Sequence, residues 1–344
     1  MSGPIRKKGM IDMMNELTRY AIQSLGFPLV GEIKVLHPGS GNAYNFLRDK
    51  VEEGSMYTSI YSAYTSMVTL RNDVLLVTPN SHAWKGDTNA GGEALTWSKG
   101  NTHMLGLDPN GVGGYQRARF SHAGFTMANF MTVGGDSNMF RHLRWMHGSS
   151  TGGASDVTCL TVSGAGNVFE DCCFGGPNDA TQASSANYNG VIVSGSHNEF
   201  RRCLFGTQNA ISRDAANEIL VLSGGGHNVF VDCIFKSRAG ATTPYFINHS
   251  NAGTGGNCTA VFLNCQFINV SPLYGSYNLA VAIVNSAGNT HWLYFDNRCS
   301  FAGVTDIVAT GNVGNIYWGG AGANSDDSAL DDRLKLGIAQ NPVV

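Results

Sequence analysis

The 344-residue chain contains 44 Gly and 31 Asn, only 14% of its residues are charged, and its formal net charge is −3. Hydrophobic residues make up 42% of the chain and aromatic residues 10%, which excludes a disordered polymer and predicts a large core. Without a basic excess or a run of 18 apolar residues, we expect neither a nucleic-acid partner nor a membrane span. Gly, Asn and Ser are poor in helix interiors, so the composition predicts many turns and strands.

Residues 1–32 are predicted to form an arm followed by a helix. The arm carries Arg6, Lys7 and Lys8, and the helix over 11–25 has apolar residues at helical spacing, which include Ile11, Met14 and Leu17. Two interpretations stay open: a cap over one end of the main domain, or a docking helix that attaches the protein to a larger assembly. The segment lacks the apolar stretch and cleavage site of a signal peptide, so none is expected.

A repeat of about 30 residues runs through the middle of the chain. Three segments share Ser-Gly, a short gap and Asn-x-Phe-x-x-Cys-x-Phe, and they end at Phe174, Phe205 and Phe235. The recurring residues are Asn167, Asn198 and Asn228; Phe169, Phe200 and Phe230; and Cys172, Cys203 and Cys233. Weaker copies follow the same pattern upstream, at Asn138 and Asn101, and downstream, at Cys265, Cys299 and Asn315. Eight copies therefore span residues 101 to 317.

Helical repeats of similar length are excluded, because Gly, Asn and β-branched residues recur too closely for helices to persist. The pattern predicts an all-β, right-handed parallel β-helix of about eight or more coils over residues 33–320. Coils about 4.8 Å apart would stack the Phe and Cys residues inward, and the Asn would hold a tight turn in the left-handed conformation. Each coil is expected to hold one strand like 159–162, one like 168–174, and a third in the excursion between copies. Residues 321–344 are expected to form a C-terminal cap or tail with a short helix.

These Asn turns and inward aromatic ladders resemble the pectate-lyase-like superfamily of right-handed parallel β-helices. Residues 57–68, followed by the strand that begins at Asp73 and ends near Pro79, resemble the cap helix and first strand of such proteins. The resemblance implies a fold rather than an activity, because this fold hosts lyases, hydrolases and inert virion proteins.

The two residues between Phe and Cys in each copy are the best candidates for chemistry. The first column reads Arg141, Glu170, Arg201, Val231, and the second reads His142, Asp171, Arg202, Asp232, Asn264. Alternating signs on neighbouring coils predict ion pairs between coils. The alternative takes Asp171 and Asp232, with Glu170 as a further candidate, as the carboxylates of a glycosidase. Two coils would separate that pair by about 9.6 Å, just beyond the inverting range of about 6.5–9.5 Å.

The histidines are weaker candidates for a functional site than the carboxylates. His197 and His227 precede the repeated Asn on neighbouring coils and are expected to stack as turn residues. Such a pair could hold a metal ion, but a third ligand is missing. His103 is expected to fill the first aromatic position of its copy. We therefore predict no metal site and no cofactor.

The sequence favours a non-enzymatic structural protein on the surface of a bacteriophage particle, most simply a head decoration or spike. That phages use such β-helices is what the resemblance implies. We also expect a homotrimer that contacts capsid or other virion proteins. Two alternatives stay open. One is a tailspike-type enzyme that cuts polysaccharide. The other is an adhesive module that binds host glycan through exposed aromatic residues, for which the candidates are Trp84, Trp97, Tyr115 and Trp318.

Overall fold

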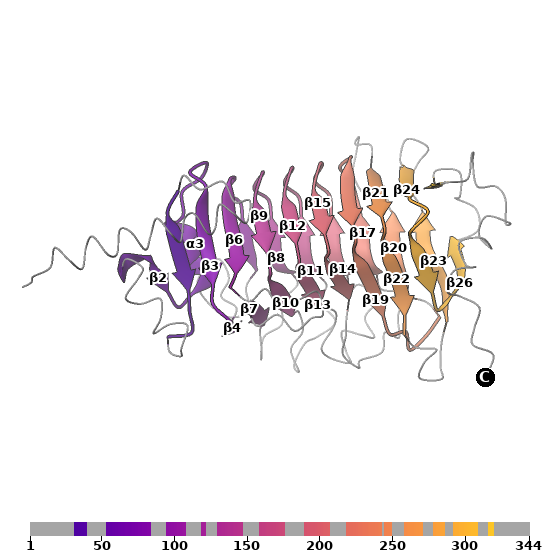
Figure 1. Cartoon of the computed structure of the whole chain (residues 1–344), viewed down its shortest axis with the longest axis horizontal. Coiled ribbons are helices and arrows are strands. Elements are labelled where there is room, and N and C mark those ends of the chain that lie inside the picture. The colour runs from indigo at the N-terminus through magenta and orange to yellow at the C-terminus, as the bar shows by residue number, and fades with distance from the viewer. Residues whose placement is uncertain are drawn as a thin grey trace, which may run out of the picture.

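A computed structural model describes residues 31–39, 53–83, 94–107, 118–121, 129–146, 158–175, 189–206, 218–242, 244–249, 258–270, 278–285, 292–308 and 316–319. In these ranges the chain forms three parallel sheets that run along one axis and give an elongated prism (Figure 1). None of the described helices has the length and apolar character needed to cross a membrane.

Apart from β2, which lies beside β1 at the end of the first sheet, the strands of each sheet follow one another in chain order, because each successive coil adds one strand to each sheet. The first sheet, A, contains β2 (Met56–Tyr57), β1 (Ile33–Leu36), β3 (Asp73–Val77), β6 (Thr102–Gly106), β9 (Met139–Arg141), β12 (Val168–Glu170), β15 (Glu199–Arg201), β18 (Asn228–Val231), β21 (Thr259–Leu263), β24 (Trp292–Phe295) and β27 (Ile316–Trp318). Sheet B contains β4 (Asn80–Ala83), β7 (Ala118–Ser121), β10 (Arg144–Met146), β13 (Cys173–Gly175), β16 (Leu204–Gly206), β19 (Ile234–Ser237), β22 (Gln266–Asn269) and β25 (Ser300–Ala302). Sheet C contains β5 (Leu95–Trp97), β8 (Asn129–Val133), β11 (Thr158–Val162), β14 (Asn189–Val193), β17 (Glu218–Leu222), β20 (Tyr245–His249), β23 (Leu279–Asn285) and β26 (Val304–Val308).

The fold is the right-handed parallel β-helix that the repeat predicts, and its all-β class is confirmed. The division of a coil into strands differs from the prediction, however. Residues 168–174 form two strands, β12 and β13, rather than one, because Asp171 takes a left-handed conformation (φ 52°) and bends the chain between them. The three strands of a coil are therefore β11, β12 and β13. The excursion at 176–188, where a third strand was expected, lies outside the described residues.

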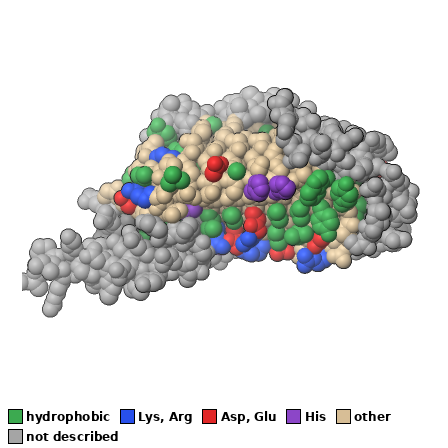
Figure 2. Space-filling view, turned by 90° about the horizontal axis from the view of Figure 1, so that it is seen from above, with side chains coloured by type: hydrophobic (Ala, Val, Ile, Leu, Met, Phe, Trp, Pro, Cys, Tyr) green, Lys and Arg blue, Asp and Glu red, His purple; other side chains and the backbone are tan. Residues whose placement is uncertain are grey.

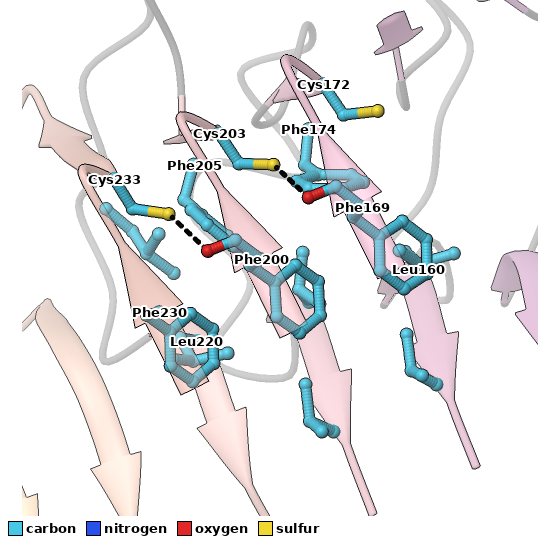
Figure 3. Close-up of a cluster of buried hydrophobic side chains, with 14 of the residues drawn as sticks. Leu160, Phe169, Cys172, Phe174, Phe200, Cys203, Phe205, Leu220, Phe230 and Cys233 are labelled. Atoms are coloured by element: carbon cyan, nitrogen blue, oxygen red, sulfur yellow. Dashed lines mark hydrogen bonds between the residues drawn. The ribbon is translucent and has the colours of Figure 1, made fainter. Parts of the chain in front are cut away.

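Two aromatic stacks fill the core. In sheet A, Phe169 lies opposite Phe140 and Phe200, and their rings are stacked with centroids 4.9 and 4.8 Å apart. In sheet B, Phe205 stacks on Phe235 at 4.6 Å. Edge-to-face contacts join the stacks, as between Phe205 and Phe230 at 5.9 Å. Offset and edge-to-face arrangements suit the aromatic quadrupole, so each additional coil extends two favourable stacks at once (Figure 3).

The Cys residues complete the bend between sheets A and B. Cys203 Sγ donates to the carbonyl oxygen of Phe169 at 3.4 Å, and Cys233 Sγ donates to that of Phe200 at 3.3 Å (Figure 3). The same contact recurs for Cys172, Cys265 and Cys299. All eight Cys are buried free thiols, and these five therefore serve as apolar side chains that also satisfy a buried carbonyl.

The short helix α3 (Ile60–Ser66), which follows a 3-10 turn at Glu53–Ser55, packs against the N-terminal end of the prism (Figure 1). Its Tyr64 ring lies 4.6 Å from that of Trp97 in β5, the first strand of sheet C. Lys99 Nζ donates to the carbonyl oxygens of residues 64, 65 and 67, which holds the C-terminal end of the helix. The helix thus covers the core where sheet C begins.

Two outer copies of the repeat lie one residue away from the predicted register. Met104 lies opposite Phe140, so Thr102 rather than Asn101 aligns with the repeated Asn, and His103 lies outside the aromatic stack. At the other end, Trp318 lies opposite Phe295 and joins the stack, which turns Tyr317 outward. The domain limits at 32/33 and 320/321 remain predictions.

Candidate functional site

The bend from sheet A to sheet B places one left-handed residue on each of five successive coils. These residues are His142, Asp171, Arg202, Asp232 and Asn264, with φ between 49° and 54°. They form the second candidate column of the sequence. The first column, which starts with Arg141 and Glu170, lies beside it on the outer face of sheet A. The structure therefore brings the candidate carboxylates into two adjacent columns, with Glu170 in the first and Asp171 and Asp232 in the second.

Glu170 lies between two arginines of neighbouring coils. Its side chain is only 9% exposed, and its two carboxylate oxygens pair with Arg141 and Arg202. Arg202 also binds both oxygens of Asp171, at 2.8 Å each. This hydrogen bond to Asp171 raises the pKa of the Arg202 guanidinium further above its usual value. Two-point contacts of this kind fix the orientation of both partners.

Asp232 lies two coils after Asp171 and makes a different contact. Its Oδ1 accepts a hydrogen bond from Asn264 Nδ2 at 2.6 Å. Arg202 occupies the coil between Asp171 and Asp232, as the column predicts. A general acid must face the group to which it gives its proton, whereas both oxygens of Asp171 accept hydrogen bonds from Arg202. The arrangement can act as an electrostatic clamp between coils.

The repeated Asn residues form a second ladder at the bend from sheet C to sheet A. The backbone N–H groups of Asn138, Asn167 and Asn198 each donate to the side-chain oxygen of the Asn one coil further on, at 2.9, 2.9 and 3.0 Å. Asn228 accepts the last of these bonds, and all four Asn side chains are buried. The left-handed conformation expected of them belongs instead to the residue before each, Ser137, Gly166, His197 and His227. The backbone bends one residue earlier, which leaves the Asn side chain to bridge the coils.

The outer face of sheet A becomes apolar toward the C-terminal coils (Figure 2). Its members are Val229, Val231, Val261, Leu263, Trp292, Tyr294 and Tyr317. Tyr317 is 43% exposed and contacts the Trp292 ring edge-to-face at 6.5 Å. The exposed aromatic residues on this surface are thus different from those the sequence proposed. Trp97 and Trp318 are buried, and Trp84 and Tyr115 lie outside the described residues.

The remaining candidates of the sequence are the docking residues, the C-terminal tail and the histidines. The docking candidates Arg6, Lys7, Lys8, Ile11, Met14 and Leu17, and the C-terminal tail, lie outside the described residues. Within the described part of the chain, no group of three or more His, Cys, Asp or Glu side chains could hold a metal ion. His103 is buried, and burial lowers its pKa to about 4. It accepts a hydrogen bond from the Met139 backbone N–H at 3.1 Å and therefore serves the structure of β6 and β9.

Comparison with solved structures supports the fold. A pectin methylesterase from Aspergillus niger superposes with a TM-score of 0.51 at 12% identity, over 88% of this chain and 88% of that one. Pectate lyase Pel9A matches with a TM-score of 0.37 at 13% identity, over 87% and 81% of the two chains. ORF18 of Geobacillus virus E2 matches with a TM-score of 0.37 at 12% identity, over 76% and 55%. No protein-family model and no curated protein matches the sequence.

The likeness to the Aspergillus niger enzyme shows the class of fold, a right-handed parallel β-helix. At 12% identity it shows the fold alone, and the function is argued from the site.

Proposed function

We propose that the protein is a non-enzymatic structural component of a bacteriophage particle, most simply a head decoration or spike on the virion surface. The observation that carries this proposal is the position of Glu170 and Asp171. Both carboxylates are held by arginines of neighbouring coils, so they join coils together instead of facing a substrate.

The same contacts argue against the polysaccharide-cutting alternative. A glycosidase needs one carboxylic acid whose pKa is raised, so that it can donate a proton to the leaving group. Two guanidiniums bind the carboxylate oxygens of Glu170, and Arg202 also binds both oxygens of Asp171. Asp232 lies on the far side of Arg202, about 9.6 Å from Asp171 by the coil spacing. Glu170 and Asp171 therefore have the surroundings of structural ion pairs, and Asp232 accepts a hydrogen bond from Asn264.

A structural role in a phage particle is supported by the contacts that recur between neighbouring coils. The aromatic stacks, the Asn ladder and the thiol contacts repeat from coil to coil, and together they make a straight, continuously packed rod (Figure 1). Low charge is expected of such a rod, because stacked like charges repel one another. That phages build surface proteins from such rods is what the resemblance of the sequence implies.

One observation favours a second candidate, an adhesive module that binds host glycan. Trp292, Tyr294 and Tyr317 lie on the outer face of sheet A, with Tyr317 the most exposed of the three. Amphipathic aromatic side chains of this kind offer a flat apolar surface together with a polar group, which suits a sugar ring. Loss of glycan binding in Tyr317→Ala, with retention in the exposed control Leu70→Ala, would favour this candidate.

Two experiments test the main proposal. Incubation with the host's surface polysaccharide is expected to release no reducing ends above those released by Asp171→Asn. If the wild-type protein releases reducing ends and the Asp171→Asn variant does not, the structural role is overturned. Immunogold labelling of phage particles is expected to mark the heads. Labelling of tails alone would reject head decoration, and absence of label from particles would reject a virion protein.

The homotrimer is a separate part of the proposal. We infer that the apolar residues of the outer face of sheet A contact a second copy, since their rows run along the axis over four coils, or about 14 Å. Analytical ultracentrifugation is expected to give three times the chain mass of 36.6 kDa. Val231→Asp in the apolar rows is expected to give the monomer mass, whereas Thr305→Asp, at an exposed position of sheet C, is expected to leave the trimer intact. A monomer at all concentrations would contradict this part.

A further inference from the structure

His197 and His227 form an exposed pair that the proposed function leaves unexplained. They occupy the same turn position on successive coils, and their rings lie 5.0 Å apart between centroids with a tilt of 35°. Both residues are exposed. Both have the same left-handed backbone, with φ of 59° and 61°, so their side chains leave the coil in the same direction. Figure 2 shows two His side chains side by side on this surface.

The ring separation matches what one metal ion requires of two imidazoles. With metal–nitrogen distances of about 2.0–2.1 Å, ring centres about 4.4 Å apart correspond to a right angle at the metal and about 5.1 Å to a tetrahedral angle. The observed 5.0 Å falls within this interval. Imidazole is a favoured ligand of Cu²⁺, Ni²⁺ and Zn²⁺. The two rings can therefore bind one such ion without a change in the spacing of the coils.

The backbone holds this geometry in place. The His197 N–H donates to the carbonyl oxygen of Gly226 at 2.9 Å, and the His227 N–H donates to Thr259 Oγ1 at 2.6 Å. The next residue of each coil, Asn198 or Asn228, belongs to the buried Asn ladder. A site on fixed backbone loses little conformational entropy when its ligand binds. The backbone thus fixes where both side chains begin, and metal binding has to order only the two exposed rings.

We propose that His197 and His227 form a two-imidazole site for a late first-row divalent cation, Cu²⁺ most strongly. Binding follows the usual order of affinity, in which Cu²⁺ exceeds Ni²⁺ and Zn²⁺. Water or a group from another molecule occupies the remaining positions of the ion. This site is independent of the proposed function, because it uses neither the carboxylates nor the apolar face of sheet A.

The first test uses Cu²⁺ alone as the probe, in isothermal titration and electron paramagnetic resonance on the full chain. Wild type is expected to show one site with two nitrogen ligands. His197→Ala and His227→Ala are each expected to weaken it at least tenfold, since chelation needs both rings, and the double variant, which keeps neither ring, is expected to lose the site. Equal affinity in wild type and the single variants would overturn the proposal. His142→Ala, on another row of turns, is the matched control and should leave the site intact.

A second test moves the pair by one coil. Gly166 precedes His197 in the same row and has φ of 66°, and a Cβ added to it would have only Ser137 Oγ within 4 Å, at 3.7 Å. Gly166→His in the His227→Ala background is therefore expected to rebuild a pair with His197 and to restore Cu²⁺ affinity within a few-fold of wild type. A double variant with unchanged circular dichroism and Tm that binds no tighter than His227→Ala would overturn the geometric basis of the site.

Discussion

The side-chain oxygen of Asn198 lies 2.9 Å from the backbone nitrogen of Asn167, which is one coil away and 31 residues earlier in the chain. The same oxygen accepts a bond from Asn167 Nδ2 at 3.1 Å, and Asn198 Nδ2 donates to the Gly164 carbonyl at 3.0 Å. One buried amide therefore satisfies polar groups at two points of the preceding coil. Because the backbone N–H groups of Asn138, Asn167 and Asn198 make the same contact on successive coils, the ladder ties these bends together along the axis.

Asn198→Ala is expected to lower the free energy of unfolding by about 3 kcal/mol, since it leaves the Asn167 N–H and the Gly164 carbonyl buried without a partner. Denaturant titration measures the change. Asn297→Ala, at an exposed position, is the control and should alter stability by less than about 0.5 kcal/mol. Equal stability of the two variants would show that the ladder contributes nothing.

The glycines that begin the same bend allow a second matched comparison. A Cβ on Gly195 would lie 2.0 Å from the Gly164 carbonyl oxygen, whereas a Cβ on Gly134 would meet nothing closer than 3.6 Å. Gly195→Ala is therefore expected to cost about 3 kcal/mol or more, because backbone must shift to make room. Gly134→Ala should be close to neutral. Thermal unfolding distinguishes them, and a Gly195→Ala variant as stable as wild type would refute the close stacking of these bends.

The buried thiols are expected to be unreactive in the folded protein. Burial raises the pKa of Cys173 and of Cys258 to about 11, and the thiolate is the reactive form. Ellman's reagent at pH 8 should therefore detect no thiol in native protein and eight in guanidinium chloride, since all eight are free and buried. Fewer than eight after unfolding without reductant would indicate disulfides, and rapid reaction in the native state would contradict their burial.

Acid should weaken the N-terminal end of the prism through Asp73. Burial alone would raise the pKa of this carboxyl, but the Arg71 guanidinium and the backbone N–H groups of Glu32 and Val68 outweigh it and lower the pKa below its usual value. A lowered folded-state pKa gives stability that is present above pH about 4 and lost as the pH falls through the folded value.

Asp73→Asn tests this assignment. The variant is expected to be about 3 kcal/mol less stable at pH 7, since Arg71 loses its buried partner. Its stability should then depend less steeply on pH between about 2 and 4 than that of wild type. Unfolding curves at several pH values measure both effects, and parallel pH profiles for the two proteins would contradict the role of Asp73.

The repeated positions were predictable from the sequence because each is required by its neighbours above and below. Phe200 must match Phe169 and Phe230 in size to stack, so the same residue recurs and the motif can be read. The ion pair between Asp171 and Arg202 was predictable for a similar reason, since opposite charges at the same position of neighbouring coils lie close enough to pair.

The errors in register arose where an outer copy of the repeat offers two adjacent candidates. Asn101 and Thr102 both suit a bend, and Tyr317 and Trp318 both suit an aromatic stack. Only pairing with Phe140 and Phe295 decides between them, and that is a contact between coils rather than a local preference. The aromatic surface at Tyr317 was missed for this reason.

Whether Glu170 is a structural or a catalytic carboxylate is tested most directly by its contribution to the free energy of unfolding. Glu170→Gln removes the charge that binds Arg141 and Arg202, while it preserves the size of the side chain. If Glu170 is part of the structural clamp, the free energy of unfolding should fall by about 3 kcal/mol, as when a buried ion pair is broken. A catalytic carboxylate is often held at a cost to stability. A Glu170→Gln variant that unfolds at the same or a higher denaturant concentration would therefore contradict the structural account.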